Sequence, residues 1–230
     1  MATPAMPTPA MPAQDDDLFA DARKRMVDSQ LRPNKVTDPR ILEAMRRIPR
    51  ERFLPAALAS LAYADEDVPL GGGRVLMEPM VLARLLQLAA PLAGERALVI
   101  AAACGYGAAV LAAAGARVTA LEENPALIAS VAMAAEAPSV NLVSGPLSAG
   151  WPAAGPYDLI VIEGAVPEVQ AAIAKQLKAD GGRLVTVIRT GGTSQAVLAE
   201  VSTSGLRARP AFDCSTPLLP SLCREAAFSF

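Results

Sequence analysis

The stretch RALVIAAACGYGAAVLAAAGAR, residues 96–117, decides how this chain folds. It begins with a short apolar run at 97–100, passes through a loop of small residues at 101–107, and continues as an alanine-rich run at 108–114. This order predicts a strand, a tight loop and a helix. A small-residue loop that leads into a helix N-terminus lets backbone N–H groups approach a ligand closely.

A second strand is predicted directly downstream, at residues 118–121, and it is followed by Glu122 and Glu123. In parallel α/β sheets, an acidic side chain at the end of the second strand binds a ribose hydroxyl of a nucleotide-type cofactor. The loop at 101–107 and Glu122 together therefore predict a cofactor site at the edge of a sheet.

Two other interpretations of the same stretch stay open. Residues 97–116 carry no charge and could form a transmembrane helix. Against this, the run is rich in alanine and glycine rather than leucine and isoleucine, and Gly105 and Gly107 interrupt it. The stretch could also be an ordinary buried strand and helix without a ligand, because short motifs match by chance.

The composition excludes several classes of function. The chain has 230 residues, a net charge of -2 and an isoelectric point near 5.3, which predict one main domain with an extension and no nucleic-acid partner. It has no histidine, which excludes histidine triads, histidine metal sites and a histidine base, and we expect no metal. Cys104, Cys214 and Cys223 are far apart, which indicates a reducing compartment, the cytoplasm. We interpret Cys104 as a small buried residue rather than a nucleophile.

The chain divides into three parts. Residues 1–17 begin with a low-complexity run of alanine, proline, methionine and threonine and are predicted to be a disordered lead. Residues 18–95 are predicted to form an extension of helices and loops packed on the core, and residues 96–230 the core itself. The polar, glycine-rich segment 63–75 is interpreted as a mobile loop. Helices are expected within the extension at residues 18–31, 38–47 and 79–92.

Helical and strand patterns alternate after Glu123. Helices are expected at 125–136 and 167–177. Strands are expected at 140–143, 158–162, 183–188, 197–202, 206–212 and 226–230. This alternation predicts an α/β fold with a doubly wound, mostly parallel sheet covered on both faces. Ligands bind such sheets beyond the carboxyl ends of the strands. The loops expected at that edge are 101–107, 122–124, 145–147 and 163–166.

Several segments resemble the protein-L-isoaspartate O-methyltransferase family, as a divergent bacterial branch of it. The most specific are IPRERFLP at residues 48–55 and CGYGAAVLA at 104–112. Weaker matches fall at residues 26–31, 37–45, 62–65, 157–160 and 177–185. The resemblance spans about residues 22–190. It implies a Rossmann-like class I methyltransferase fold, S-adenosylmethionine as cofactor, and methylation of isoaspartyl carboxylates in damaged protein or peptide substrates.

The chain departs from the family pattern in the cofactor loop. The family has glycine-x-glycine-x-glycine, preceded by an acidic residue; here Ala101 and Ala103 stand at the first two glycines, Gly105 is retained, and Val99 stands at the acidic position. Alanine crowds the ligand or forces a positive φ that costs about 1–2 kcal/mol. We expect cofactor affinity to be about one or two orders of magnitude weaker. We also expect a return to glycine to strengthen binding and to cost roughly 0.4–1 kcal/mol of stability per residue.

Two further family segments have changed. The Ser-Gln-Pro stretch, whose hydroxyl lies near the reacting carboxylate, is replaced by Met77, Glu78 and Pro79, and the Gly-Asp-Gly stretch that contacts adenine has lost its carboxylate. The resemblance assigns the substrate side to Met77, Glu78 and Pro79. It assigns the cofactor side to Ala101, Ala103, Gly105, Tyr106, Glu122, Pro146, Leu147 and Glu163.

The expected reaction needs few catalytic groups from the protein. Methyl transfer is an in-line displacement, and an isoaspartyl carboxylate is already ionised at neutral pH, so no general base is needed and positioning supplies the rate. The first hypothesis is therefore an S-adenosylmethionine-dependent methyltransferase of the isoaspartyl type. The second is a non-catalytic descendant with weakened or lost cofactor binding that acts as a binding or assembly module. A nicotinamide-dependent enzyme is disfavoured, because the Gly-x-Gly-x-x-Gly turn is absent.

Overall fold

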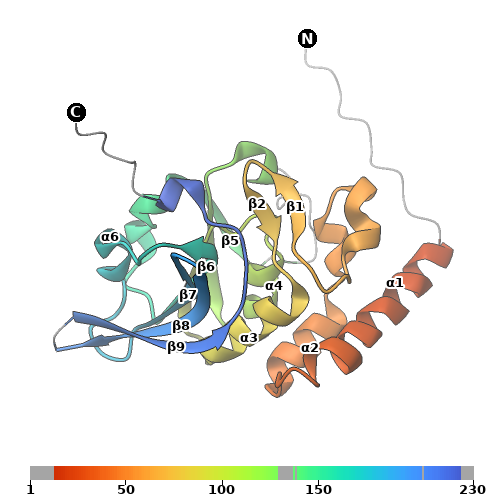
Figure 1. Ribbon diagram of the computed structural model, residues 1–230, viewed down its shortest axis with the longest axis horizontal. Helices are drawn as coiled ribbons and strands as arrows, with labels where there is room; N and C mark the ends of the chain where they lie inside the picture. Colours follow the sequence, from red (N-terminus) through yellow and green to blue (C-terminus); the bar gives the residue numbers. More distant parts are fainter. Residues whose placement is uncertain (1–12, 129–136, 138, 204, 224–230) are drawn as a thin grey trace, which may run out of the picture.

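A seven-stranded sheet forms the centre of the computed structural model, which describes residues 13–128, 137, 139–203 and 205–223 (Figure 1). The strand order is β5-β4-β3-β6-β7-β8-β9; the first five strands are parallel, and β8 pairs antiparallel with both β7 and β9. The strands are β3 (Arg96–Ile100), β4 (Arg117–Glu122), β5 (Asn141–Ser144), β6 (Leu159–Val166), β7 (Arg183–Thr190), β8 (Thr193–Ser202) and β9 (Gly205–Asp213). The mostly parallel α/β fold is thereby confirmed.

Alternate residues of β3 enter two separate apolar clusters. Ala97 and Val99 pack in the larger cluster, with the N-terminal extension and the helices α3 (Pro79–Ala89) and α4 (Tyr106–Ala113), whereas Leu98 and Ile100 pack in the smaller one on the other face. Successive side chains of a strand point to opposite faces, so an apolar run of this kind needs cover on both sides. The expected doubly covered sheet follows from this burial.

The cover on the second face is thinner than expected. The pattern at 167–177 predicted a helix of eleven residues, but α6 contains only Ala171–Ala174. Short 3-10 turns, η4 (Leu147–Ala149) and η5 (Pro152–Ala154), complete this side. Figure 1 shows α6 at the opposite side of the molecule from α1 and α2.

The N-terminal helices form largely as predicted. α1 (Ala13–Arg25) continues into a π-helical turn, η1 (Met26–Leu31), which ends two residues before Pro33. α2 (Pro39–Arg47) is capped by Asp38, whose side chain accepts a hydrogen bond from Arg40 N. Because α1 begins at Ala13, residues 13–17 are helical rather than part of a disordered lead. Residues 1–12 lie outside the described residues.

The interpretation of residues 63–75 as a mobile loop was wrong. The segment contains a β-hairpin, in which β1 (Val68–Gly71) pairs antiparallel with β2 (Arg74–Leu76). Gly71, Gly72 and Gly73 have φ values of 88°, 60° and 75°, which glycine adopts without a steric penalty. The three glycines therefore make a tight turn.

The remaining elements agree with the expected pattern where they are described. The turns η2 (Arg50–Phe53) and η3 (Ala56–Leu61) follow α2, and η6 (Pro220–Leu222) lies near the end of the described chain. The helix expected at 125–136 begins at residues 125–128, and the rest of it, like the strand expected at 226–230, lies outside the described residues. No helix in the described part of the chain is long and apolar enough to cross a membrane.

Candidate active site

Three strands end together at one edge of the sheet. In the parallel register, Ile100 pairs with Leu121 and Glu122 pairs with Ser144, so the loops that follow β3, β4 and β5 meet there. Residues 163–166 do not form a loop as predicted; they belong to β6, whose register with β7 shifts between Val161 and Ala165. This edge is the predicted ligand edge.

The loop after β3 keeps three left-handed positions. Ala101 has φ 63°, Ala103 has φ 50° and Gly105, the N-cap of α4, has φ 86°. These are the three positions at which the family pattern has glycine. Only glycine adopts such angles freely, and each alanine is strained there by about 1–2 kcal/mol. The loop therefore has left-handed backbone angles at all three positions, although two of them carry alanine.

Glu122 is fully buried and joins this loop to the end of β4. Its Oε2 accepts hydrogen bonds from Ala103 N at 2.8 Å and from Arg74 Nη2 at 2.7 Å. Its Oε1 accepts from Glu123 N at 2.9 Å and from Asn124 N at 3.0 Å. The predicted ribose-binding carboxylate therefore lies at the predicted place, and it is paired with an arginine that the sequence reasoning did not single out.

Arg74 comes from β2 and is also buried. Its Nε and Nη1 have no hydrogen-bond partner among the described residues. The signal that could have revealed it is an arginine in an otherwise apolar strand, directly after three glycines. A cation at such a position needs a buried anionic partner.

Glu163, on β6, is buried beside the first turn of α4. A Cβ added to Gly107 would lie 2.1 Å from Glu163 Oε1, and this oxygen has no hydrogen-bond partner within the described part of the chain. Burial raises the pKa of Glu163 to about 8; Arg74 opposes the shift and Glu122 adds to it. The carboxyl group fills the space that glycine at 107 leaves.

The raised pKa of Glu163 makes stability depend on pH. Between pH 4.5 and about 8 the unfolded chain is ionised at this group while the folded chain keeps the proton, so stability is highest below this window and falls as pH rises through it. At 1.36 kcal/mol per pKa unit, a shift from 4.5 to about 8 corresponds to a loss of about 5 kcal/mol. We expect Glu163→Gln to remove this loss when melting is compared at pH 5 and pH 8.5. The same loss in both proteins would contradict the assignment.

Tyr106 anchors the loop to the N-terminal extension. Its ring is fully buried, lies edge-on to Phe53 with centroids 5.4 Å apart, and is 4.9 Å from the Arg50 guanidinium carbon. The contacts that the structure records for this ring are thus an aromatic contact with Phe53 and a cation–π contact with Arg50, both within the chain. Cys104 is buried and its pKa is raised to about 11 by burial, which fits a structural cysteine and not a nucleophile.

The segment predicted to face the substrate lies between the hairpin and α3. Met77 is buried, and its carbonyl accepts a hydrogen bond from Arg50 Nη2; Pro79 begins α3. Glu78 is half-buried, its N donates to Asp67 Oδ1 at 2.7 Å, and burial together with nearby Asp65 and Asp67 raises its pKa to about 7. This side is acidic, and hydrogen bonds with Arg50 and Asp67 hold its backbone.

The segment predicted to contact adenine is built differently from the family pattern. Pro146 is exposed and Leu147 is fully buried, and Leu147 N lies 3.4 Å from Glu123 Oε2. Glu123 Oε1 accepts a hydrogen bond from Ser221 Oγ at 2.6 Å. A carboxylate is thus present on this side, supplied by Glu123 rather than by the lost aspartate.

A C-terminal segment, residues 217–222, crosses this edge of the sheet. Ala165 N donates to Pro217 O at 3.0 Å, and Leu219 N donates to Ala165 O at 2.8 Å. Pro220 lies against the glycine turn of the hairpin, since a Cβ on Gly73 would be 3.2 Å from Pro220 Cγ. The hairpin and the C-terminal segment together cover the predicted cofactor edge (Figure 1).

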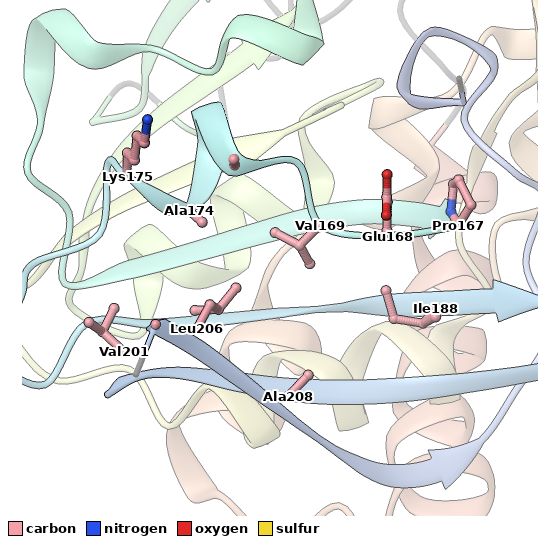
Figure 2. Close-up of a pocket in the computed structure, with 11 residues that line it drawn as sticks. Pro167, Glu168, Val169, Ala174, Lys175, Ile188, Val201, Leu206 and Ala208 are labelled. Carbon is pink, nitrogen blue, oxygen red and sulfur yellow. The ribbon is translucent and has the colours of Figure 1, made fainter. Parts of the chain in front are cut away.

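A cavity of about 620 Å³ lies elsewhere, between α6 and the strands β7 to β9. Figure 2 shows Val169 from the segment before α6 and Ile188 and Leu206 from the strands among its lining side chains. It is mostly apolar, and none of the predicted site residues lines it.

Comparison with known proteins decides the family. The family model described as Protein-L-isoaspartate(D-aspartate) O-methyltransferase matches residues 21–207. A Protein-L-isoaspartate O-methyltransferase of Methylorubrum populi is 43% identical over 166 residues, which are 71% of this chain and 78% of that relative. The chain belongs to this family. The expected family, its class I methyltransferase fold and its O-methyltransferase class are confirmed.

Solved structures of this family agree. One protein-L-isoaspartate O-methyltransferase superposes with a TM-score of 0.74 at 25% identity, covering 87% of this chain and 67% of that one. A second, from Plasmodium falciparum and solved with S-adenosyl-L-homocysteine, gives a TM-score of 0.73 at 16% identity and covers 86% of this chain and 98% of that one. At that identity the second structure supports the fold alone.

Proposed function

We propose that this chain methylates isoaspartyl carboxylates of damaged proteins or peptides, with S-adenosylmethionine as the methyl donor. Family membership supplies the reaction class. The observation that carries the proposal is the loop after β3, which has left-handed angles at Ala101, Ala103 and Gly105 and is tied to Glu122 by the Ala103 N–H. We place the reaction in the cytoplasm, because the cysteines are free thiols.

The residues at this edge fit the proposed cofactor. Buried polar atoms almost always have hydrogen-bond partners. Yet Glu163 Oε1, beside the first turn of α4, is buried without one among the described residues. An unpartnered acceptor beside a left-handed loop suits a polar ligand better than an apolar one.

Each candidate residue then has a distinct role toward the cofactor. Glu122 would accept the ribose hydroxyls, and Ala101, Ala103 and Gly105 would bring the loop backbone against the ligand. Pro146 and Leu147 would lie on the adenine side, Glu163 would line the site beside α4, and Tyr106 would hold the loop in place through its packing. When bound, the cofactor supplies an electrophilic methyl group on a sulfonium centre.

The substrate side is formed by Met77, Glu78 and Pro79. These residues offer no hydroxyl to align the reacting carboxylate, but that carboxylate needs no base because it is ionised at neutral pH. The chain contributes by positioning: the Arg50 hydrogen bond fixes the Met77 carbonyl, and the Asp67 hydrogen bond fixes Glu78 N. The half-buried Glu78 would repel an anionic substrate once ionised, so transfer should slow as pH rises through about 7.

The test is methyl transfer from labelled S-adenosylmethionine to a peptide that contains one isoaspartyl residue. The control is the same peptide with an ordinary aspartyl residue. We expect a base-labile methyl ester on the isoaspartyl peptide alone. Absence of ester in a preparation that binds S-adenosylhomocysteine would contradict the catalytic proposal and favour the binding or assembly module.

A further inference from the structure

The hydrogen bonds of Glu122 leave no room for a ribose. A carboxylate has about four lone-pair sites for hydrogen bonds. In the described part of the chain Glu122 accepts four, from Ala103 N, Glu123 N, Asn124 N and Arg74 Nη2. Three of these donors are backbone groups of the sheet edge itself. The fourth is a side chain from the hairpin, and it is the donor that can leave.

The hairpin that carries Arg74 lies over the same edge. A Cβ on Gly72 would be 3.5 Å from Nδ2 of Asn124, two residues after Glu122 in the chain, and one on Gly73 would be 3.2 Å from Pro220 Cγ. Arg74 follows immediately, and its side chain reaches inward to Glu122 with 5% exposure for the arginine and 0% for the glutamate. The ion pair therefore joins the hairpin to the floor of the site.

Arg74 also has a second acidic neighbour. Glu163 Oε1 has no hydrogen-bond partner among the described residues, and Arg74 is the charge that most favours the ionised form of Glu163. Release of the guanidinium from Glu122 toward Glu163 would favour ionisation of the Glu163 carboxyl group, which keeps its proton up to about pH 8 while Arg74 pairs with Glu122. The arrangement provides one arginine with two buried carboxyl groups.

We propose that Arg74 is a latch that holds the β1–β2 hairpin closed through Glu122, and that the cofactor ribose must displace it to bind. The inference rests on the proposed cofactor site. It makes Arg74 a residue that sets cofactor affinity, because a ligand that binds the open state alone loses apparent affinity in proportion to the closed population.

The test compares wild type, Arg74→Gln and Arg74→Lys by calorimetric titration with S-adenosylhomocysteine, and follows amide hydrogen exchange of the hairpin without ligand. Arg74→Gln should bind about tenfold more tightly and exchange faster at residues 68–76. Arg74→Lys keeps a cation beside both carboxyl groups but loses the forked guanidinium, so its affinity should lie between those of wild type and Arg74→Gln. Because it keeps a counter-charge for Glu122, it also supplies a folded variant for the comparison if Arg74→Gln unfolds.

A matched control is Arg183→Gln. Arg183 forms an ion pair of the same 2.7 Å length with Glu95. Glu95 lies at the start of β3, whereas the loop of the proposed cofactor site follows the end of that strand. The Arg183→Gln variant should therefore leave cofactor affinity and hairpin exchange unchanged. Equal affinity in wild type and both Arg74 variants would overturn the latch and leave the cofactor site standing. Weaker binding in the variants would overturn it by showing that Arg74 contacts the cofactor. Binding in none of the proteins would overturn the cofactor site and the latch with it.

Discussion

Replacing Glu122 by glutamine is expected to lower the free energy of unfolding by about 3–5 kcal/mol, the usual cost of removing one partner from a buried ion pair. Both carboxylate oxygens accept hydrogen bonds, from donors on either side. A glutamine amide presents N–H groups to one of these donor pairs and leaves Arg74 without a counter-charge. Denaturant unfolding of the two proteins measures the difference.

Two further variants show whether the loss of stability comes from breaking the Glu122–Arg74 ion pair or from replacing any paired glutamate by glutamine. Glu122→Gln combined with Arg74→Gln removes both charges and should recover part of the lost stability, since a buried pair is replaced at lower cost than it is broken. Glu95→Gln breaks the more exposed pair with Arg183 and should cost about 1 kcal/mol. A cost for Glu122→Gln no larger than that of Glu95→Gln would show that the Glu122 network does not hold the loop.

The double change Ala101→Gly with Ala103→Gly is expected to strengthen S-adenosylmethionine binding at least tenfold, which corresponds to about 1.4 kcal/mol of relieved crowding. Stability should stay within about 1 kcal/mol of wild type. The sequence alone predicted a loss, but both residues have positive φ, so relief of about 1–2 kcal/mol each offsets the greater unfolded-state freedom of glycine and the lost methyl burial.

Ala109→Gly is the matched control for that prediction. Ala109 is as buried as Ala103, but it lies inside α4 with an intrahelical hydrogen bond to Gly105 O. Glycine there should cost about 1 kcal/mol or more and leave binding unchanged. If the double variant loses as much stability as Ala109→Gly, the left-handed angles do not strain the alanines.

Local patterns were enough to predict the sheet and its ligand edge. The apolar run at 97–100 and the small-residue loop after it identify β3 and its turn, and the acidic end of β4 identifies Glu122. Parallel strands then bring their carboxyl ends to one edge, so the neighbours of Glu122 follow from the order of the elements.

The parts that the sequence did not reveal depend on contacts between distant segments. Arg74 and Glu122 are 48 residues apart, and nothing local to either predicts their ion pair. The contact of Pro220 with the glycine turn is a similar case. Three consecutive glycines predict a mobile loop when the sequence is considered locally, and the C-terminal segment that covers their tight turn is distant in the sequence. The short α6 differs for another reason: its sequence pattern is helical, and the backbone leaves the helix after Ala174.

Titration of the wild-type chain with S-adenosylmethionine by calorimetry tests the central claim most directly, since every assigned role depends on a cofactor at the β3–β4 edge. We predict one binding site per chain with a dissociation constant between about 1 µM and 1 mM, which is the usual range of Michaelis constants of enzymes for their substrates. Binding should be lost on competition with S-adenosylhomocysteine. A folded protein that gives no heat of binding up to about 1 mM would contradict the account.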